Sequence, residues 1–136
     1  MAEGIFNHLA ESGSLHAKSA GLAAGSGYPA AQSSQQAAKA YGIDLSRHRS
    51  QPVTPELVRE AKLILAMTKS QEEEILERYP KSQGKVFTLK EYAGMQGDIV
   101  DPIGLDLKVY QKVFDEIRDA VEKVFRKIGA TENRSA

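Results

Sequence analysis

Apolar residues form one nearly uninterrupted run near the middle of the chain, from Ala61 to Met67. A strand that helices cover on both faces carries apolar side chains on both faces, so it reads as a continuous run and not as an alternation. Helical patterns lie before and after this run. It therefore predicts a central strand of an α/β sheet, with its carboxyl end near Thr68, and ligands of such sheets bind beyond the carboxyl ends of the strands.

Helical spacing and helix-start residues mark the segments around this strand. The clearest is the last, in which apolar residues recur every three or four positions from Tyr110 to Ile128. The remaining predicted helices are 1–12, one with Pro29 in its first turn that runs to Tyr41, a short one capped by Thr54, and one capped by Ser70 with Glu73 in the capping-box position.

Two more short apolar segments, Leu15–Leu22 and Lys85–Leu89, predict further strands, and Glu91–Asp101 predicts a long loop. Strands that alternate with helices imply a parallel sheet with right-handed crossovers. The chain therefore predicts one α/β domain over residues 1–128, followed by a flexible tail over 129–136.

Charge and composition narrow the classes of function. The 136 residues carry 18 basic and 18 acidic side chains, so no net field favours nucleic acid or an anionic membrane. No apolar run approaches the roughly 18 residues of a membrane span. The chain contains no cysteine, which excludes disulfides, thiolate metal sites and cysteine catalysis within these residues. The three histidines have no metal-site spacing, so no metal or cofactor is predicted, and a cytoplasmic protein is expected.

Five stretches together resemble the low-molecular-weight protein-tyrosine phosphatase family, which includes bacterial arginine phosphatases and arsenate reductases. The resemblance extends from Met1 to about Ile128. The stretches are Met1–Phe6, Ser19-Ala20-Gly21, Gly42–Ser46 with His48-Arg49-Ser50, Ala66-Met67-Thr68, and Asp101-Pro102-Ile103-Gly104.

This resemblance implies a three-layer α/β/α fold with four parallel strands and no metal. It also implies a departure, because the family opens with a strand and a Cys-x5-Arg phosphate loop, and Met1 matches the position just after that loop. The first strand, the cysteine nucleophile and the phosphate-binding arginine are thus expected to be absent here. Neither Arg47 nor Arg49 can replace that arginine, because both match positions outside the loop.

Asp101 is the candidate catalytic residue that remains. The resemblance implies that the aspartate of its Asp-Pro pair protonates the leaving oxygen and later activates water. Pro102 restricts Asp101 to an extended backbone, and a carboxyl in a half-dry cleft can serve as a general acid. The alternative interpretation is that Asp101 only starts a turn before the last helix. Asp98 is interpreted as solvated or structural.

Ile103 takes the position at the substrate entrance where the family often has an aromatic residue. An aliphatic side chain offers no ring stacking, so the sequence favours a phosphoarginine substrate over phosphotyrosine. Two other candidates have plainer interpretations. His48, between Arg47 and Arg49, could form an anion-binding patch, but a structural hydrogen bond is favoured. Ser19 is likewise interpreted as a structural hydrogen-bonding residue.

The sequence therefore predicts a phosphatase that acts on phosphorylated protein in its full-length form, with this chain a truncated and inactive part of it, owing to a mis-assigned start or a shortened product. The alternative is a non-catalytic binding or regulatory protein that folds with a partner strand. Without the first strand, the neighbours at Leu15–Leu22 and Ala61–Met67 would pair with each other, stay poorly folded, or take a strand from a partner or a second copy through exposed sheet edges.

Overall fold

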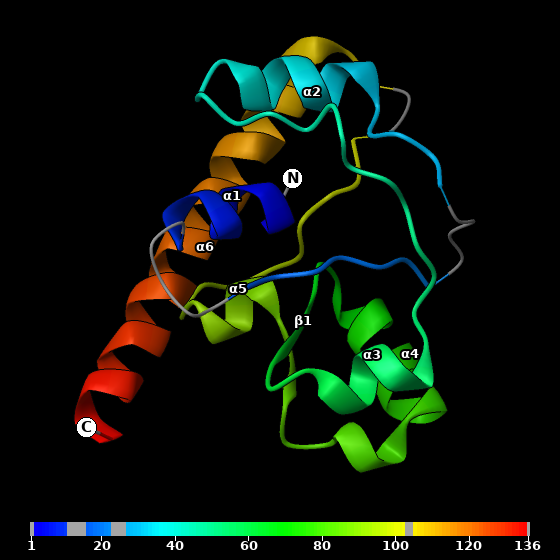
Figure 1. Ribbon diagram of the computed structural model, residues 1–136, viewed down its shortest axis with the longest axis vertical. Helices are drawn as coiled ribbons and strands as arrows, with labels where there is room; N and C mark the ends of the chain where they lie inside the picture. The colour runs from blue at the N-terminus through cyan, green and yellow to red at the C-terminus, as the bar shows by residue number, and fades with distance from the viewer. Residues whose placement is uncertain (1, 11–15, 23–26, 103–104, 136) are drawn as a thin grey trace.

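The computed structural model of the chain describes residues 2–10, 16–22, 27–102 and 105–135. Two parallel strands, β1 (Ile64–Ala66) and β2 (Val86–Thr88), pair with Ile64 opposite Val86. The other elements are α1 (Ala2–Leu9), α2 (Gln32–Lys39), α3 (Pro55–Glu60), α4 (Lys69–Arg78), the 3-10 helix η1 (Pro80–Ser82), α5 (Leu89–Tyr92) and α6 (Leu107–Ser135). The predicted α/β class with a parallel sheet is confirmed (Figure 1).

Side chains along the predicted central run face two separate cores. Leu63, Leu65 and Met67 pack against a large core that α6 dominates. Ile64 and Ala66 belong to a smaller core with Ile75 of α4. Alternate residues of a strand point to opposite faces, so the continuous apolar run does serve both faces of β1. Only Ala66 among the three strand residues is fully buried.

Helix α6 is the main support of the large core. Its apolar stripe includes Phe114, which has no exposed surface. Helices α1 and α2 both pack on α6, as Figure 1 shows. Phe6 of α1 meets Phe125 edge-on with ring centroids 5.7 Å apart, and Tyr41 stacks on Phe114 at 4.9 Å. This packing confirms the helix that the spacing from Tyr110 predicted.

One helix start was predicted correctly and another was wrong. Thr54 caps α3, because its side chain accepts a hydrogen bond from the backbone N–H of Leu57. For α4, the predicted cap at Ser70 is wrong. Thr68 is the cap, and Gln71 completes a capping box with it. The helix begins two residues earlier because Thr68, two residues after β1, has an extended backbone and Gln71 supplies an amide side chain three positions further on.

The predicted strand over Leu15–Leu22 is wrong for the described part of that segment. Leu15 lies outside the described residues, and of residues 16–22 only Gly21 pairs, in an isolated parallel bridge with Pro52. Described residues 16–22 do not pair with β1, so the first of the three alternatives, in which the two neighbours pair with each other, is not observed in this part of the chain. A strand needs a neighbour for its backbone groups, which a pattern of side chains cannot supply.

Three other boundaries differ from the prediction. Pro29 does not start a helix but forms an antiparallel bridge with Arg49, and α2 begins at Gln32. The segment 91–92, predicted as loop, belongs to α5, which Thr88 caps. Helix α6 continues to Ser135, beyond the last apolar residue of its stripe at Ile128. The flexibility of residues 129–136 stays a prediction. No helix in the described residues is long and apolar enough to cross a membrane.

Candidate functional site

The loop that carries Asp101 is fastened to the carboxyl end of β1. The backbone N–H of Ile99 donates to the carbonyl oxygen of Met67 at 2.9 Å. The backbone N–H of Lys69, at the start of α4, donates to Oδ1 of Asp98 at 2.9 Å. Two hydrogen bonds therefore hold this loop at the carboxyl-terminal end of the sheet, where ligands of parallel α/β proteins bind.

Residues on either side of Asp101 decide how its carboxylate is presented. Ile99 is 3% exposed, and Pro102 is also buried, whereas Asp101 between them is exposed. Pro102 restricts Asp101, the residue before it, to extended backbone geometry. On a loop held by hydrogen bonds, an exposed carboxyl group can give a proton, or as a carboxylate take one, when a reacting group approaches the carboxyl end of β1.

A lysine between two glutamates lies beside this loop. The ammonium of Lys69 is 3.3 Å from the carboxylate of Glu72 and 3.3 Å from that of Glu91. Hydrogen bonds to Glu91 and then to Glu72 raise the pKa of Lys69 above its ordinary value. Glu72 is 7% exposed, and a buried carboxylate requires such a partner. Lys69 is thus engaged by its neighbours at the start of α4.

The structure assigns Asp98 a structural role, as the sequence indicated, because its carboxylate accepts the Lys69 amide at a helix start. A carboxylate is favourable there because of the unpaired N–H groups and the helix dipole. Ile103, the predicted substrate-entrance residue, lies outside the described residues. The roles predicted for Asp101 and Ile103 stay predictions.

A cluster of polar side chains joins α1 to two segments that are distant in the sequence, around Ser19 and around His48. Oε2 of Glu3 is 2.8 Å from Nδ1 of His48 and accepts a hydrogen bond from Oγ of Ser19 at 3.1 Å. One turn further along α1, the amide side chain of Asn7 donates to the carbonyl oxygen of Ala17 at 2.9 Å and accepts from its N–H at 2.7 Å. Side chains of α1 thereby take the place of a neighbouring strand for residues 16–20.

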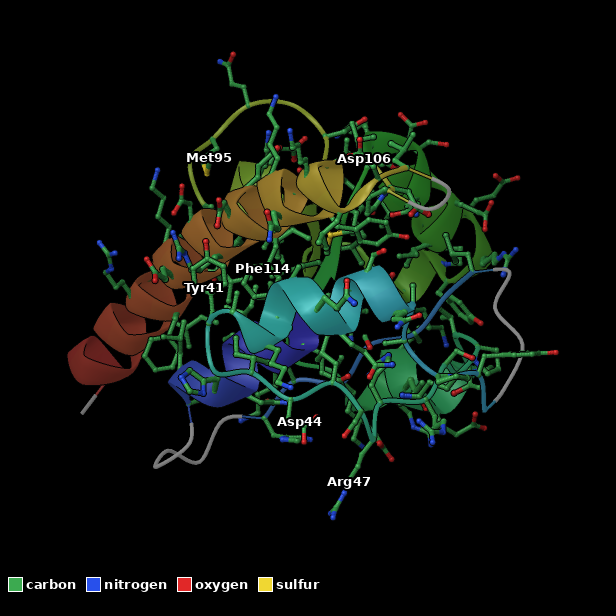
Figure 2. All side chains as sticks on the ribbon, turned by 90° about the horizontal axis from the view of Figure 1, so that it is seen from above. Tyr41, Asp44, Arg47, Met95, Asp106 and Phe114 are labelled. Atoms are coloured by element: carbon green, nitrogen blue, oxygen red, sulfur yellow. The ribbon has the colours of Figure 1, made fainter. Side chains whose placement is uncertain are left out.

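His48 and the two arginines that flank it make separate contacts in the folded chain. His48 makes the structural contact with Glu3 that the sequence favoured. Arg49 donates to the carbonyl oxygens of Ser46 and His48, within its own turn. Arg47 points away from the body of the molecule in Figure 2. The three side chains therefore do not converge into an anion-binding patch.

Two cavities flank the loop 42–45. One, of about 360 Å³, lies on the α1 side and includes Glu3 and His48 in its lining. The other, of about 600 Å³, lies on the α2 side and includes Gln35 and Lys39. Asp101 lines neither cavity. Within the described residues, no group of three or more histidine, aspartate or glutamate side chains is placed to hold a metal ion.

The sequence analysis did not predict that Glu3 and Asn7 bind distant segments of the chain. Their partners are 10 to 45 positions away along the chain, at Ala17, Ser19 and His48. The available signal was their spacing, because residues four apart lie on the same face of a helix. That spacing shows that the two side chains act on one side of α1 but not which segment they meet.

Comparisons with known proteins agree on one family. The family model for low molecular weight phosphotyrosine protein phosphatases matches residues 1–134. A probable low molecular weight protein-tyrosine-phosphatase, EpsP of Ralstonia nicotianae, is 41% identical over 104 residues, which are 76% of this chain and 70% of that protein.

Solved structures show the same similarity in three dimensions. The YwlE arginine phosphatase of Geobacillus stearothermophilus superposes with a TM-score of 0.94 at 30% identity, over 99% of this chain and 87% of that one. A YwlE arginine phosphatase mutant, in which a phosphorylated active-site serine replaces a cysteine, has a TM-score of 0.88 at 34% identity, over 94% of this chain and 86% of that one.

Proposed function

Because the chain belongs to the low molecular weight phosphotyrosine protein phosphatase family, we propose that it is the acid-bearing part of an enzyme that removes phosphate from protein side chains. One observation carries the proposal. Hydrogen bonds join the loop 98–102 to the carboxyl end of β1 and to the start of α4, and the exposed carboxylate of Asp101 lies on this loop. The family resemblance gives the aspartate of this Asp-Pro pair the role of general acid and base.

The proposed reaction has two steps. A thiolate attacks the phosphorus atom, the bond from phosphorus to the leaving oxygen or nitrogen breaks, and Asp101 gives its proton to the leaving group. The Asp101 carboxylate then takes a proton from a water molecule, whose oxygen attacks the phosphocysteine and releases inorganic phosphate and the thiolate. The 136 residues contain no cysteine, so the thiolate in this scheme comes from outside them. We therefore expect this chain alone to be inactive.

The substrate is proposed to be a phosphorylated protein, with phosphoarginine favoured over phosphotyrosine. The relatives support both, since one is an arginine phosphatase and another a probable tyrosine phosphatase. The reason for the preference is Ile103, which the family resemblance assigns to the substrate entrance, because an aliphatic side chain gives no stacking to a phenyl ring. A cytoplasmic location belongs to the same proposal.

We also propose that a strand from outside these residues pairs with β1. Within the described residues β1 pairs only with β2. An unpaired strand edge is a template for another strand, so a partner or a second copy can occupy it. Light scattering coupled to gel filtration tests the second copy: a monomer at all concentrations would exclude self-association through this edge. No separate observation favours the non-catalytic alternative.

The decisive experiment completes the active site. A fusion would place the strand and cysteine loop of the Geobacillus stearothermophilus arginine phosphatase ahead of residue 1, and it would be assayed with free phosphotyrosine and phosphoarginine. We expect activity in the fusion and none in the 136-residue chain. Asp101→Asn should lower kcat roughly 10²- to 10⁴-fold, the usual contribution of general acid–base catalysis.

The matched control is Asp119→Asn, which removes an exposed carboxylate from α6 and should leave kcat unchanged. If Asp101→Asn retained full kcat in a folded, active fusion, Asp101 would not be the acid. Faster turnover of phosphotyrosine than of phosphoarginine would overturn the substrate preference without affecting the role of Asp101.

A further inference from the structure

Large exposed apolar side chains concentrate around Asp101. Of five such residues in the described part of the chain, three lie within positions 100–107: Val100 is 64% exposed, Leu105 49% and Leu107 39%. Ile99, next to Val100, is only 3% exposed. Single exposed apolar residues need no explanation, but a group of them indicates an interaction site.

The exposed residues are held outward by their neighbours. Ile99 is fixed by its hydrogen bond to Met67, and the N–H of Leu105 donates to the carbonyl oxygen of the buried Pro102 at 2.9 Å. In the sequence, Val100 and Leu105 flank Asp101, and each is next to, or hydrogen-bonded to, a buried residue. A surface that is already ordered loses less conformational entropy when a partner binds.

The charge of this segment selects among partners. Residues 98–107 contain three aspartates and no lysine or arginine. Asp98 and Asp106 each accept a backbone N–H at the start of a helix, from Lys69 and Val109 respectively. These bonds position the two carboxylates but leave their charge. An acidic partner would meet like charges here, whereas an apolar or basic one would not.

From these observations we propose that Val100 and Leu105 form a docking surface for the protein substrate. The surface takes an apolar residue next to the phosphorylated one and disfavours acidic neighbours. The inference rests on the proposed function, in which this end of β1 receives the phosphorylated side chain of a protein substrate. Val100 directly precedes Asp101 in the chain, so a substrate whose phosphorylated side chain reaches Asp101 comes close to Val100.

The first test uses the 136-residue chain itself. Two short unphosphorylated peptides, which differ only in a leucine or a glutamate beside the acceptor residue, would be titrated into isotope-labelled protein. We expect the leucine peptide to shift the amide signals of Val100, Asp101 and Leu105, and the glutamate peptide to shift them far less. Equal shifts with both peptides, or shifts confined to other residues, would overturn the proposal.

The second test measures catalysis in the fusion described above. With the phosphorylated forms of the two peptides, KM should be roughly four- to fifteenfold lower for the leucine peptide, the gain expected from burying one or two methylene groups. Val100→Thr with Leu105→Asn should bring the ratio of the two KM values close to one. A ratio that survives both substitutions in a folded protein would place the discrimination elsewhere.

Two measurements on the fusion distinguish failure of the docking surface from failure of the proposed acid: turnover of free phosphotyrosine, and the preference between the two peptides. Turnover of free phosphotyrosine by Asp101→Asn reports the acid alone, because that substrate has no flanking residue. If Asp101→Asn retained full turnover while the leucine peptide was still preferred, the docking surface would stand and the acid role would fall. If Asp101→Asn lost turnover and the preference was missing, the acid role would stand and the docking surface would fall.

Discussion

The Asp98 carboxylate accepts a hydrogen bond from the backbone N–H of Lys69 at 2.9 Å and thereby joins the Asp101 loop to the first turn of α4. The two residues are 29 positions apart in the chain. Asp98 precedes Asp101 by three residues, so the position of the proposed acid depends on this bond. We therefore predict that Asp98 positions Asp101 for its proposed role.

Replacing Asp98 should therefore move Asp101. Asp98→Ala removes the acceptor, and in the fusion we expect kcat to fall roughly tenfold to a hundredfold, since small displacements of a catalytic group carry such costs. Asp98→Asn keeps an acceptor oxygen and should restore most of the activity. Amide hydrogen exchange of Lys69 in the unfused chain gives an independent readout, and it should quicken only in Asp98→Ala. Unchanged exchange in that variant would contradict the predicted role.

The capping box of α4 gives a prediction about stability. Thr68→Ala should lower the free energy of unfolding by about 1 kcal/mol, because the N–H of Gln71 loses its acceptor. Urea denaturation followed by circular dichroism measures the change. Ser70→Ala is the matched control, since Ser70 is exposed and does not cap the helix. A larger loss for Ser70→Ala than for Thr68→Ala would show that the helix begins later.

The bonds between Asn7 and Ala17 predict a local effect. Asn7→Ala leaves both backbone groups of Ala17 without this partner, at a cost of roughly 1–3 kcal/mol for a part-buried pair. We expect faster amide exchange at Ala17 together with a lower unfolding midpoint. Asn7→Asp keeps the acceptor for the Ala17 N–H and loses the donor, so its effect should be intermediate. If the Ala17 amide exchanged at the wild-type rate in Asn7→Ala, the Asn7 side chain would not be what protects it.

Asp44 predicts a dependence of stability on pH. Hydrogen bonds from Ser46 to its carboxylate lower the pKa of Asp44 below its ordinary value of 3.8. A group whose pKa is lower in the folded state stabilises the fold above its unfolded pKa, and this contribution is lost as the pH falls through the folded pKa. The thermal midpoint should thus drop on acidification below about pH 4.

In Asp44→Asn that part of the drop should disappear, because an amide does not titrate and still offers an acceptor to the N–H of Ser46. The measurement is the difference between the two midpoints at pH 7 and at pH 3. Identical pH dependence in the two proteins would mean that Asp44 contributes nothing to acid sensitivity.

Features that depend on a few neighbouring residues could be predicted from the sequence. Thr54 with Pro55 marked the start of α3, and the apolar spacing from Tyr110 marked α6. The run from Ala61 marked a strand with apolar residues on both faces, and the resemblance at Asp101-Pro102 marked the candidate acid. In each case the cause is local: a capping oxygen, a helical period, or a short motif.

Long-range pairing decided the rest. Leu15–Leu22 has the composition of a strand, yet the described part of it has no strand neighbour, and Asn7 and Glu3 hold it instead. No local pattern states that His48 and Ser19 meet at one carboxylate, or that Lys69 binds Asp98. Local sequence patterns thus indicate which segments can form helices and strands and where the proposed acid lies along the chain. Which backbone groups find partners depends on the folded chain, because hydrogen bonds between distant segments form only when those segments are packed together.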